Sequence, residues 1–350
     1  MSKFYTLTVA AITVETDNAV SVTFAIPEAY KSVFTFKPGQ YITISKQLNG
    51  KDLRRAYSIC APMQGNTLQI GIKKVEGGEF SVYATTQLKV GDTLEVSAPE
   101  GRFILDPNPS NQHNYLAFVA GSGITPVLSM IVSVLAIEAK SSFVLVYGNK
   151  TPDDMMFATA LSDLLSQYEG RFFMEQVFSQ ATVEGALFGR IDTGTLNFIV
   201  KNKYKDRSFH SVYLCGPEAM IGLIEAGLLA NGFNKSKIFF ELFSTPVEKL
   251  PSAVSLEGKT EVTVLLDDET SSFTMDKSKT ILEQALLKGL DAPYSCQGGI
   301  CSTCLAQITE GQAVMDKNSI LTEDEVASGL ILTCQAHPVT NTISIDYDDV

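Results

Sequence analysis

The sequence has few of the features on which several common protein classes depend. Only three of its 350 residues are histidine, and His113, His210 and His337 are too scattered along the chain to suggest a metal site or a catalytic triad. The motifs G-x-S-x-G and H-E-x-x-H are missing, so neither an α/β-hydrolase nucleophile nor a zinc-protease helix is indicated. Internal repeats and low-complexity tracts are also absent, and a composition of 45% hydrophobic and 19% charged residues excludes disordered and collagen-like classes.

Positive charge is scarce. The net charge is -12 and the isoelectric point is about 4.8, which argues against nucleic acid or an anionic membrane as a partner. The deficit lies in residues 256–350, where 16 acidic residues face 5 basic ones, while residues 1–255 carry a balance of only -1. The last quarter of the chain is therefore expected to be a separate module with its own partner or a solubilising face.

Long apolar segments are missing as well. Residues 1–17 alternate like a strand and contain no apolar secretory core, so the cytoplasm is the expected compartment. Residues 107–137 contain no charged side chain, but Gly121-Ser122-Gly123-Ile124-Thr125-Pro126 interrupts them. This stretch predicts a buried strand followed by a buried helix, and no membrane span.

The pattern of apolar residues changes twice along the chain. Short alternating runs in residues 1–106 (such as 7–16, 41–45 and 67–75) predict an antiparallel β-barrel or sandwich. In residues 107–243, strand-like runs alternate with helical ones at 126–139, 154–167 and 219–232, which predicts a parallel α/β sheet. Two prolines mark residues 244–257 as a linker before a third domain at 258–350.

The strongest motif lies in that third domain. Cys296-x4-Cys301-x2-Cys304, with Cys334 further on, has the C-x4-C-x2-C...C spacing of plant-type 2Fe-2S ferredoxins. Gly298 and Gly299 would let the loop wrap a cluster and direct N–H groups at the sulfurs. A structural zinc site is the alternative, although zinc ligands usually come as two C-x2-C pairs.

Two weaker signals point to nucleotide cofactors. Tyr57 and Ser58 offer an aromatic ring and a hydroxyl to a flavin, while Gly77-Gly78 before a helical run places free N–H groups near phosphate. Alternatively, Tyr57 is a core residue, and Lys73 and Lys74 are solvated charges on an edge strand. Both interpretations remain open from this segment alone.

The turn at Gly121-Ser122-Gly123 joins a strand to an apolar helix, so its glycines would allow close approach to a pyrophosphate. It is not a complete G-x-G-x-x-G, and the same glycines are also ordinary turn residues. Cys215, before Gly216-Pro217, stands alone, and a lone cysteine at such a position is a small buried hydrophobe more often than a functional thiol.

Taken in order, these motifs resemble the ferredoxin-NADP reductase family, here with a C-terminal ferredoxin domain as in the reductase components of bacterial multicomponent oxygenases. The residues that carry the resemblance are Arg55-x-Tyr57-Ser58, Gly77-Gly78-x-x-Ser81, Gly121-x-Gly123-x-Thr125-Pro126, Cys215-Gly216-Pro217 and Glu241-x-Phe243. Within that family the likeness is greatest to the reductase subunits of phenylacetyl-CoA epoxidases, and it spans nearly the whole chain.

The resemblance implies FAD, NADPH and a 2Fe-2S cluster as cofactors. It implies that Ser58 lies near flavin N5, with Cys215 and Glu241 bordering the nicotinamide and Phe243 covering the second flavin face. Arg55 and Ser81 would hold FAD phosphate and Tyr57 would pack on the isoalloxazine. The remaining residues implied to bind a cofactor are Ala56, Ile72, Lys73, Gly77, Gly78, Gly121, Gly123, Thr125, Pro126, Gly216 and Pro217.

The residues that would select the coenzyme depart from the family pattern. NADP-preferring relatives often have Arg after the residue that corresponds to Ser179, whereas this chain has Gln180. Lys150 would supply a cation to the 2'-phosphate instead, although lysine is a weaker bidentate partner than arginine. NADPH is therefore expected and NADH stays possible.

The implied function is electron transfer. Hydride from NADPH would reach the flavin, and single electrons would then pass through the cluster to the diiron oxygenase of a phenylacetyl-CoA epoxidase, the expected protein partner. The alternatives are an NADH-dependent reductase for a Rieske or other ring-hydroxylating oxygenase, and a redox sensor that holds both cofactors without turnover. The fold class expected is a flavin-binding β-barrel, a parallel α/β nicotinamide-binding domain and an α+β ferredoxin domain.

Overall fold

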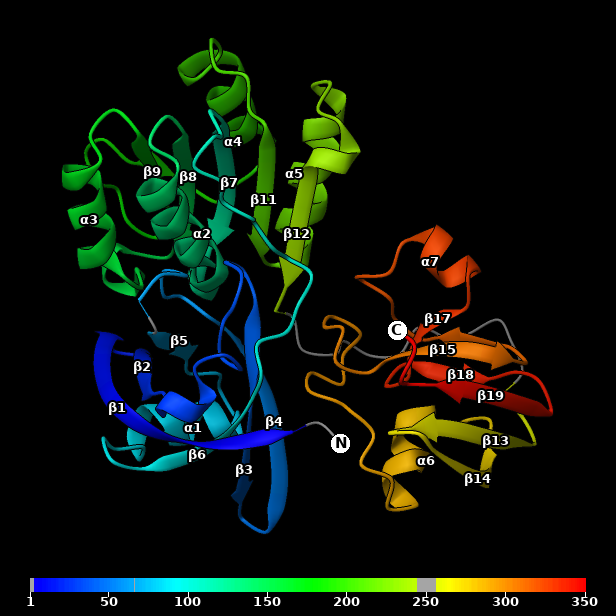
Figure 1. Ribbon diagram of the computed structural model, residues 1–350. Helices are drawn as coiled ribbons and strands as arrows, with labels where there is room; N and C mark the ends of the chain where they lie inside the picture. Colours follow the sequence, from blue (N-terminus) through cyan, green and yellow to red (C-terminus); the bar gives the residue numbers. More distant parts are fainter. Residues whose placement is uncertain (1–2, 66, 244–255) are drawn as a thin grey trace. The chain divides into compact units, whose positions relative to one another are not determined.

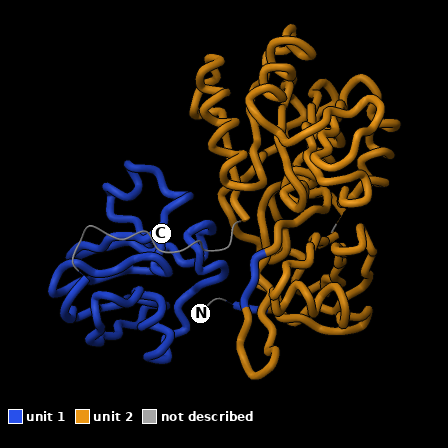
Figure 2. The backbone as a smooth tube through the Cα atoms, turned by 180° about the vertical axis from the view of Figure 1, so that it is seen from behind, with its two compact units in different colours: residues 1–4, 54–56, 244–350 blue, residues 5–53, 57–243 orange. Residues whose placement is uncertain are grey.

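The computed structural model describes residues 3–65, 67–243 and 256–350 (Figure 1). The chain consists of two compact units, coloured separately in Figure 2. One unit contains residues 5–53 and 57–243, and the other contains residues 1–4, 54–56 and 244–350. Most of the linker predicted at 244–257 lies outside the described residues.

The first sheet is the antiparallel one that the alternating runs predict. Its six strands follow the order β4-β3-β6-β1-β2-β5. An isolated bridge between Ile59 and Ile70 brings the chain after β4 to the opposite edge strand, β5, as expected for a closing barrel. The strands are β1 (Phe4–Thr16), β2 (Ala19–Ala25), β3 (Tyr41–Leu48), β4 (Lys51–Ser58), β5 (Leu68–Lys73) and β6 (Thr93–Ser97).

Alternation explains how this sheet is stabilised. Side chains that point inward from successive strands, such as Leu7, Val22, Ile44 and Ile70, are fully buried in one apolar core. Helix α1 (Glu79–Thr86) adds Phe80 to that core. The helix begins where the sequence predicts it, directly after Gly77 and Gly78.

The second sheet is parallel, with strand order β10-β9-β8-β7-β11-β12. Its middle strands are buried on both faces, as the near-continuous apolar runs indicate. The strands are β7 (Asn114–Ala120), β8 (Ser142–Asn149), β9 (Phe172–Phe178), β10 (Leu187–Phe188), β11 (Ser211–Gly216) and β12 (Ile238–Leu242). The helices are α2 (Ile124–Ile137), α3 (Ala158–Gln167), α4 (Thr193–Asn197) and α5 (Glu218–Ala230).

The order in which strands are added reverses between β7 and β11. The strands β8, β9 and β10 are added on one side of β7, whereas β11 and β12 are added on its other side. In doubly wound sheets ligands bind outside the carboxyl ends of the strands at this switch point. The uncharged stretch forms β7 and α2, which confirms the buried strand and helix. No described helix is long and apolar enough to cross a membrane.

The third sheet is mixed, with order β14-β13-β19-β15-β17, where β13 and β19 are parallel and the other pairs antiparallel. Helix α6 (Ile281–Leu287) contributes Ile281, Leu282 and Ala285 to its core. The strands are β13 (Lys259–Leu266), β14 (Glu269–Asp276), β15 (Leu305–Glu310), β17 (Leu330–Leu332) and β19 (Thr342–Asp346), with a separate pair β16 (Ala313–Met315) and β18 (Ala336–Pro338). A short helix α7 (Glu323–Ala327) is capped by Thr322 and Glu325.

Candidate functional site

Three of the predicted catalytic residues converge from three strands. Ser58, at the end of β4, is buried, and its Oγ donates a hydrogen bond of 3.1 Å to Oε2 of Glu241 in β12. Glu241 stands opposite Cys215 in the register of β12 and β11. The hydrogen bond therefore joins the antiparallel sheet to the parallel sheet over 183 residues of sequence.

Cys215 lies at the switch point of the parallel sheet. Its side chain is fully buried, and this burial, with the nearby charge of Glu241, raises the pKa of its thiol well above the usual value. The thiol is therefore neutral at physiological pH. A Cβ at Gly123 would lie only 2.4 Å from the Cys215 carbonyl oxygen, so the glycine turn after β7 packs against the backbone at the end of β11 with no room for a side chain.

The glycine turn itself combines a left-handed residue with a short 3-10 turn. Gly121 has φ +55°, and residues Gly121–Gly123 form one 3-10 turn before α2. Thr125 and Pro126 are buried in the first turn of α2, where Thr125 Oγ1 donates to the Ser122 carbonyl at 3.1 Å. The backbone at the carboxyl end of β7 is therefore formed by residues with small side chains, Gly121-Ser122-Gly123.

In the antiparallel sheet, Tyr57 is half-buried, with its ring centroid 5.7 Å from that of Phe80. Gly77 has φ +72°, and Gly78 forms the N-cap of α1, where no side chain caps the helix. Ser81 Oγ accepts a hydrogen bond of 3.1 Å from the Val75 N–H, which leaves its own hydrogen free to donate. The helix start thus presents both backbone N–H groups and a hydroxyl.

The edge strand β5 contributes a buried Ile72 and a half-buried Lys73. Lys73 Nζ lies 3.9 Å from the place that a Cβ on Gly121 would occupy, so the strand reaches the glycine turn of the other sheet. This cation is thus directed toward the turn.

The other predicted residues lie as follows. Arg55 is exposed in β4, next to Ala56, and its Nη1 donates to the Arg54 carbonyl at 2.8 Å. Lys150, after β8, is exposed, and its carbonyl accepts from Gln180 N–H at 2.8 Å, so these two positions are adjacent. Gly216 ends β11, Pro217 precedes α5, and Phe243, just after β12, is 40% exposed.

The predicted cluster loop has its own geometry in the other unit. The Gly298 N–H donates to Cys296 Sγ at 3.3 Å. Gly299 has φ +69°, and a Cβ there would lie 2.7 Å from the Lys317 carbonyl. Both glycines therefore do what the sequence predicts: one directs an N–H at a sulfur and the other allows a turn that has no room for a side chain.

The four thiols form two hydrogen-bonded pairs, and in each pair the shared hydrogen bond lowers the pKa of one cysteine (Cys296, Cys334) and raises that of the other (Cys301, Cys304). Hydrogen bonds from the Cys301 thiol and from the backbone at Gly298 and Ile300 lower the pKa of Cys296. The Cys304 thiol and the Gly299 N–H lower the pKa of Cys334 in the same way. Thiolates are the form that binds iron, and N–H donors to sulfur stabilise them. Cys296 and Cys301 are thus in contact, as are Cys304 and Cys334.

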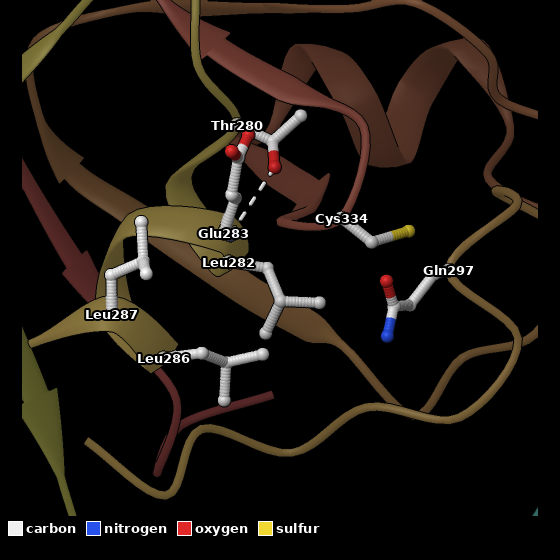
Figure 3. Close-up of a pocket in the computed structure, with 7 residues that line it drawn as sticks. All are labelled: Thr280, Leu282, Glu283, Leu286, Leu287, Gln297 and Cys334. Carbon is white, nitrogen blue, oxygen red and sulfur yellow. Dashed lines mark hydrogen bonds between the residues drawn. The ribbon is translucent and has the colours of Figure 1, made fainter. Parts of the chain in front are cut away.

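A hollow of about 320 Å³ lies beside Cys334 (Figure 3). In this view the sulfur of Cys334 and the amide of Gln297 lie on one side and the side chains of Leu282 and Leu286 on the other. Leu287, at the end of α6, is 70% exposed. The remaining lining residues are Thr280 and Glu283, joined by a hydrogen bond of 3.2 Å from the Glu283 N–H to Thr280 Oγ1.

Comparison with protein families gives three matches. Residues 6–104 match the oxidoreductase FAD-binding domain, residues 118–226 the oxidoreductase NAD-binding domain, and residues 264–339 the 2Fe-2S iron-sulfur cluster binding domain. The third range contains all four clustered cysteines. The ferredoxin interpretation is confirmed in place of structural zinc.

Relatives match the chain from end to end. A subunit of the 1,2-phenylacetyl-CoA epoxidase of Escherichia coli K12 is 38% identical over 99% of both chains, and the ferredoxin reductase component of a Rhodococcus rhodochrous 3-ketosteroid-9-alpha-monooxygenase is 30% identical over 99% of this chain and 97% of its own. The chain belongs to the family of oxygenase reductases with FAD, NAD and 2Fe-2S domains. Both relatives are named as components of oxygenase systems.

Solved structures agree on the fold of this oxygenase reductase. Phthalate dioxygenase reductase superposes with a TM-score of 0.62 at 22% identity, covering 98% of both chains. An intact type IV self-sufficient cytochrome P450 monooxygenase superposes with a TM-score of 0.71 at 22% identity, where this chain spans 41% of the larger protein. The predicted fold class is confirmed: an antiparallel flavin-binding barrel, a parallel α/β sheet and a ferredoxin domain.

The sequence did not reveal how the flavin-binding and coenzyme-binding halves of the larger unit contact each other. Glu15 in β1 accepts a hydrogen bond from the Phe157 N–H, and Gly71 leaves room for Thr125, Met156 and Phe157. Glu15 and Phe157 are 142 residues apart, so no local pattern marks them as partners. The only local signal is Gly71 within a strand, which can indicate a close approach of another segment.

Proposed function

We propose that the chain passes electrons from NADPH, through FAD and a 2Fe-2S cluster, to the diiron oxygenase of a phenylacetyl-CoA epoxidase in the cytoplasm. The observation that carries the reductase chemistry is the Ser58–Glu241 hydrogen bond beside Cys215, because it brings one residue of each sheet to one point. The identity of 38% over the full length to the epoxidase subunit supports the choice of oxygenase.

The residues of the barrel fit a flavin. Gly77 and Gly78 with the Ser81 hydroxyl offer donors to phosphate, Arg55 adds a charge, and Ala56, Ile72 and Lys73 complete the binding set. Tyr57 would pack on the ring system and Phe243 would cover its other face. When bound, a flavin accepts a hydride and releases electrons singly, which is the conversion needed between a nicotinamide and a 2Fe-2S cluster.

The residues of the parallel sheet fit the nicotinamide coenzyme. Gly121 and Gly123 would approach the pyrophosphate, while Thr125, Pro126, Cys215, Gly216 and Pro217 would line the nicotinamide site. A neutral, buried Cys215 excludes water and supplies a small apolar surface. Ser58 would orient the reacting ring atoms through its hydroxyl, held in place by Glu241.

The four cysteines Cys296, Cys301, Cys304 and Cys334 would hold the cluster. Two of them already receive backbone hydrogen bonds, and two have a lowered pKa. Such donors stabilise negative charge on sulfur, which is the charge state that iron ligands need.

Lys150 is the residue that we propose selects NADPH. It is exposed and next to Gln180 at the edge where β8 and β9 end, and its ammonium would pair with the 2'-phosphate. Lys150→Ala should raise the KM for NADPH about five- to tenfold, as expected for the loss of one charge-assisted contact, and leave that for NADH unchanged. Equal effects on both coenzymes would contradict this assignment.

The decisive experiment combines the purified protein with a phenylacetyl-CoA epoxidase oxygenase and phenylacetyl-CoA. We expect NADPH consumption that requires the thioester and is faster than with NADH. Fast reduction of ferricyanide without coupling to that oxygenase would favour the second candidate, a reductase for a ring-hydroxylating oxygenase. Loaded protein that reduces neither acceptor would favour a redox sensor.

A further inference from the structure

A bulge in β1 places a carboxylate at the contact between the two sheets of the larger unit. In the pairing of β1 with β2, Val14 stands opposite Val20 and Thr16 opposite Ala19, so Glu15 is the extra residue. A bulge changes the direction of its side chain, and bulges are frequent beside functional sites. The side chain of Glu15 therefore does not follow the alternating directions of the other side chains in its strand.

Both oxygens of the Glu15 carboxylate are used. Oε1 accepts a hydrogen bond of 2.7 Å from Ser21 Oγ in the same sheet, and Oε2 accepts one of 3.1 Å from the Phe157 N–H, which belongs to the coenzyme-binding half. Bonds to a charged acceptor are stronger than those between neutral groups. Glu15 therefore connects the two halves through a single side chain.

The backbone at Phe157 is strained. Phe157 has φ +59°, a left-handed conformation that a bulky residue rarely adopts, and helix α3 begins only at the next residue. Such strain persists where the surroundings hold it, and it is typical of functional positions. The Phe157 N–H is the group that Glu15 holds.

The two halves touch at the same place. Ser21 stands opposite Gly71 in the pairing of β2 with β5. A Cβ on Gly71 would lie 2.6 Å from Thr125 Cγ2 and 3.1 Å from both Met156 Cε and Phe157 Cζ. The strand that continues into Ile72 and Lys73 therefore packs, without an intervening side chain, against the start of α2.

A buried tyrosine extends this connection to the glycine turn. The Tyr147 hydroxyl lies 3.1 Å from the Gly121 carbonyl oxygen and 3.5 Å from that of Met156. Tyr147 is fully buried in β8. The position of Met156-Phe157 is thereby transmitted to the turn that would approach the coenzyme.

We propose that Glu15 is a positioning residue for hydride transfer. It fixes residues 156–157, and through Tyr147 the Gly121 turn, against the flavin-binding strand β5, so that the nicotinamide arrives at the correct distance. This inference rests on the proposed function. Rates of such reactions are sensitive to displacement, with about 10²-fold lost for 1 Å.

The test is the rate of flavin reduction by NADPH and by NADH under anaerobic conditions, measured by stopped-flow absorbance. Glu15→Ala should lower the limiting rate at least tenfold with both coenzymes, with little change in their apparent dissociation constants. Asp17→Ala is the matched control, because it removes an exposed carboxylate from the adjacent hairpin turn and should behave like the wild type. Flavin content and photochemical reduction should be the same in all three proteins.

Two further measurements keep the result decisive. The Phe157 amide should exchange with deuterium faster in Glu15→Ala than in the wild type. If Glu15→Ala does not fold, Ser21→Ala, which removes the bond to Oε1 and a longer one from Gln69 Nε2 but keeps the carboxylate, should still slow reduction severalfold. An unchanged rate in Glu15→Ala, or in Ser21→Ala where that is the folded variant, would overturn the role of Glu15. A wild-type protein that neither coenzyme reduces would instead contradict the proposed function.

Discussion

The hydrogen bond between Ser58 and Glu241 connects the flavin-binding sheet of this reductase to its coenzyme-binding sheet through a single pair of side chains. Ser58 is buried at a strand end, and its hydroxyl donates to a carboxylate from another sheet. A buried hydroxyl with an oriented partner has a fixed direction. Ser58 and Glu241 therefore form a preorganised pair.

We expect Ser58→Ala to slow flavin reduction by NADPH by on the order of 10²-fold, because a hydrogen-bonding group next to the reacting atoms is lost. Flavin content should be unchanged, since Ser58 is one of many residues in the binding set. Ser45→Ala is the control, because the Ser45 hydroxyl in β3 donates a hydrogen bond to the exposed Asp52 in β4. The measurement is the rate of flavin reduction in the two variants by stopped-flow absorbance. Similar rates would show that Ser58 is only a packing residue.

Among the elements, the glycine loop that carries three of the cysteines has no room for a side chain at Gly299. Gly299 combines a left-handed φ with the close approach of the Lys317 carbonyl. Ser319 N–H also donates to the Gly299 carbonyl at 3.1 Å, so the loop is fastened to the segment before α7. The shape of the loop is thus set by contacts on both sides.

Gly299→Ala should lower iron content and visible absorbance of the cluster severalfold, because a Cβ would meet backbone 2.7 Å away. Gly289→Ala is the matched control: Gly289 has φ +83°, but nothing lies within 4 Å of its missing Cβ. That control should lose only about 1 kcal/mol of stability, the cost of left-handed backbone. Equal cluster loss in both variants would show that the left-handed backbone, and not the lack of space for a Cβ, makes glycine necessary at position 299.

Across the molecule as a whole, the hydrophobic cores are separate. The ferredoxin sheet has a core of its own, built from residues such as Val262, Ile281 and Ile345. The barrel has another, which includes Leu7 and Ile70. Separate cores allow one domain to lose its cofactor while the other keeps its fold.

Cys334→Ser should therefore remove or cripple the cluster while the yellow flavin and ferricyanide reduction by NADPH remain within about twofold of the wild type. Iron analysis and flavin absorbance measure both parts on one sample. Loss of the flavin together with the cluster would contradict the independence of the domains.

The uneven charge predicts a salt effect on the complete system. Residues 256–350 carry a balance of -11, which would attract a basic surface on the oxygenase and raise the association rate. Electron delivery to the oxygenase should fall several-fold between about 50 mM and 500 mM salt, as screening shortens the reach of these charges. Flavin reduction in the same salt series is the control, and a salt-independent delivery rate would exclude electrostatic docking.

Local patterns in the chain predicted the fold classes of its parts and the 2Fe-2S cluster, while FAD and NADPH followed from the resemblance to a known family. These patterns are strand alternation, apolar helices, and cysteines separated by four and two residues. The run at 154–167 predicts one helix, yet α3 starts at Ala158, after a 3-10 turn at Pro152–Asp154 and a left-handed Phe157 whose N–H binds the Glu15 carboxylate. A local pattern has no information on a partner 142 residues away.

How the flavin-binding and coenzyme-binding halves meet was decided by folding in three dimensions. The Ser58–Glu241 bond, the direction that the bulge at Glu15 imposes, and the space left at Gly71 each join segments that are far apart in the chain. Whether two polar groups become partners depends on where both strands end after folding. Residue spacing therefore set the chemistry available to this protein, while packing set the geometry in which that chemistry is presented.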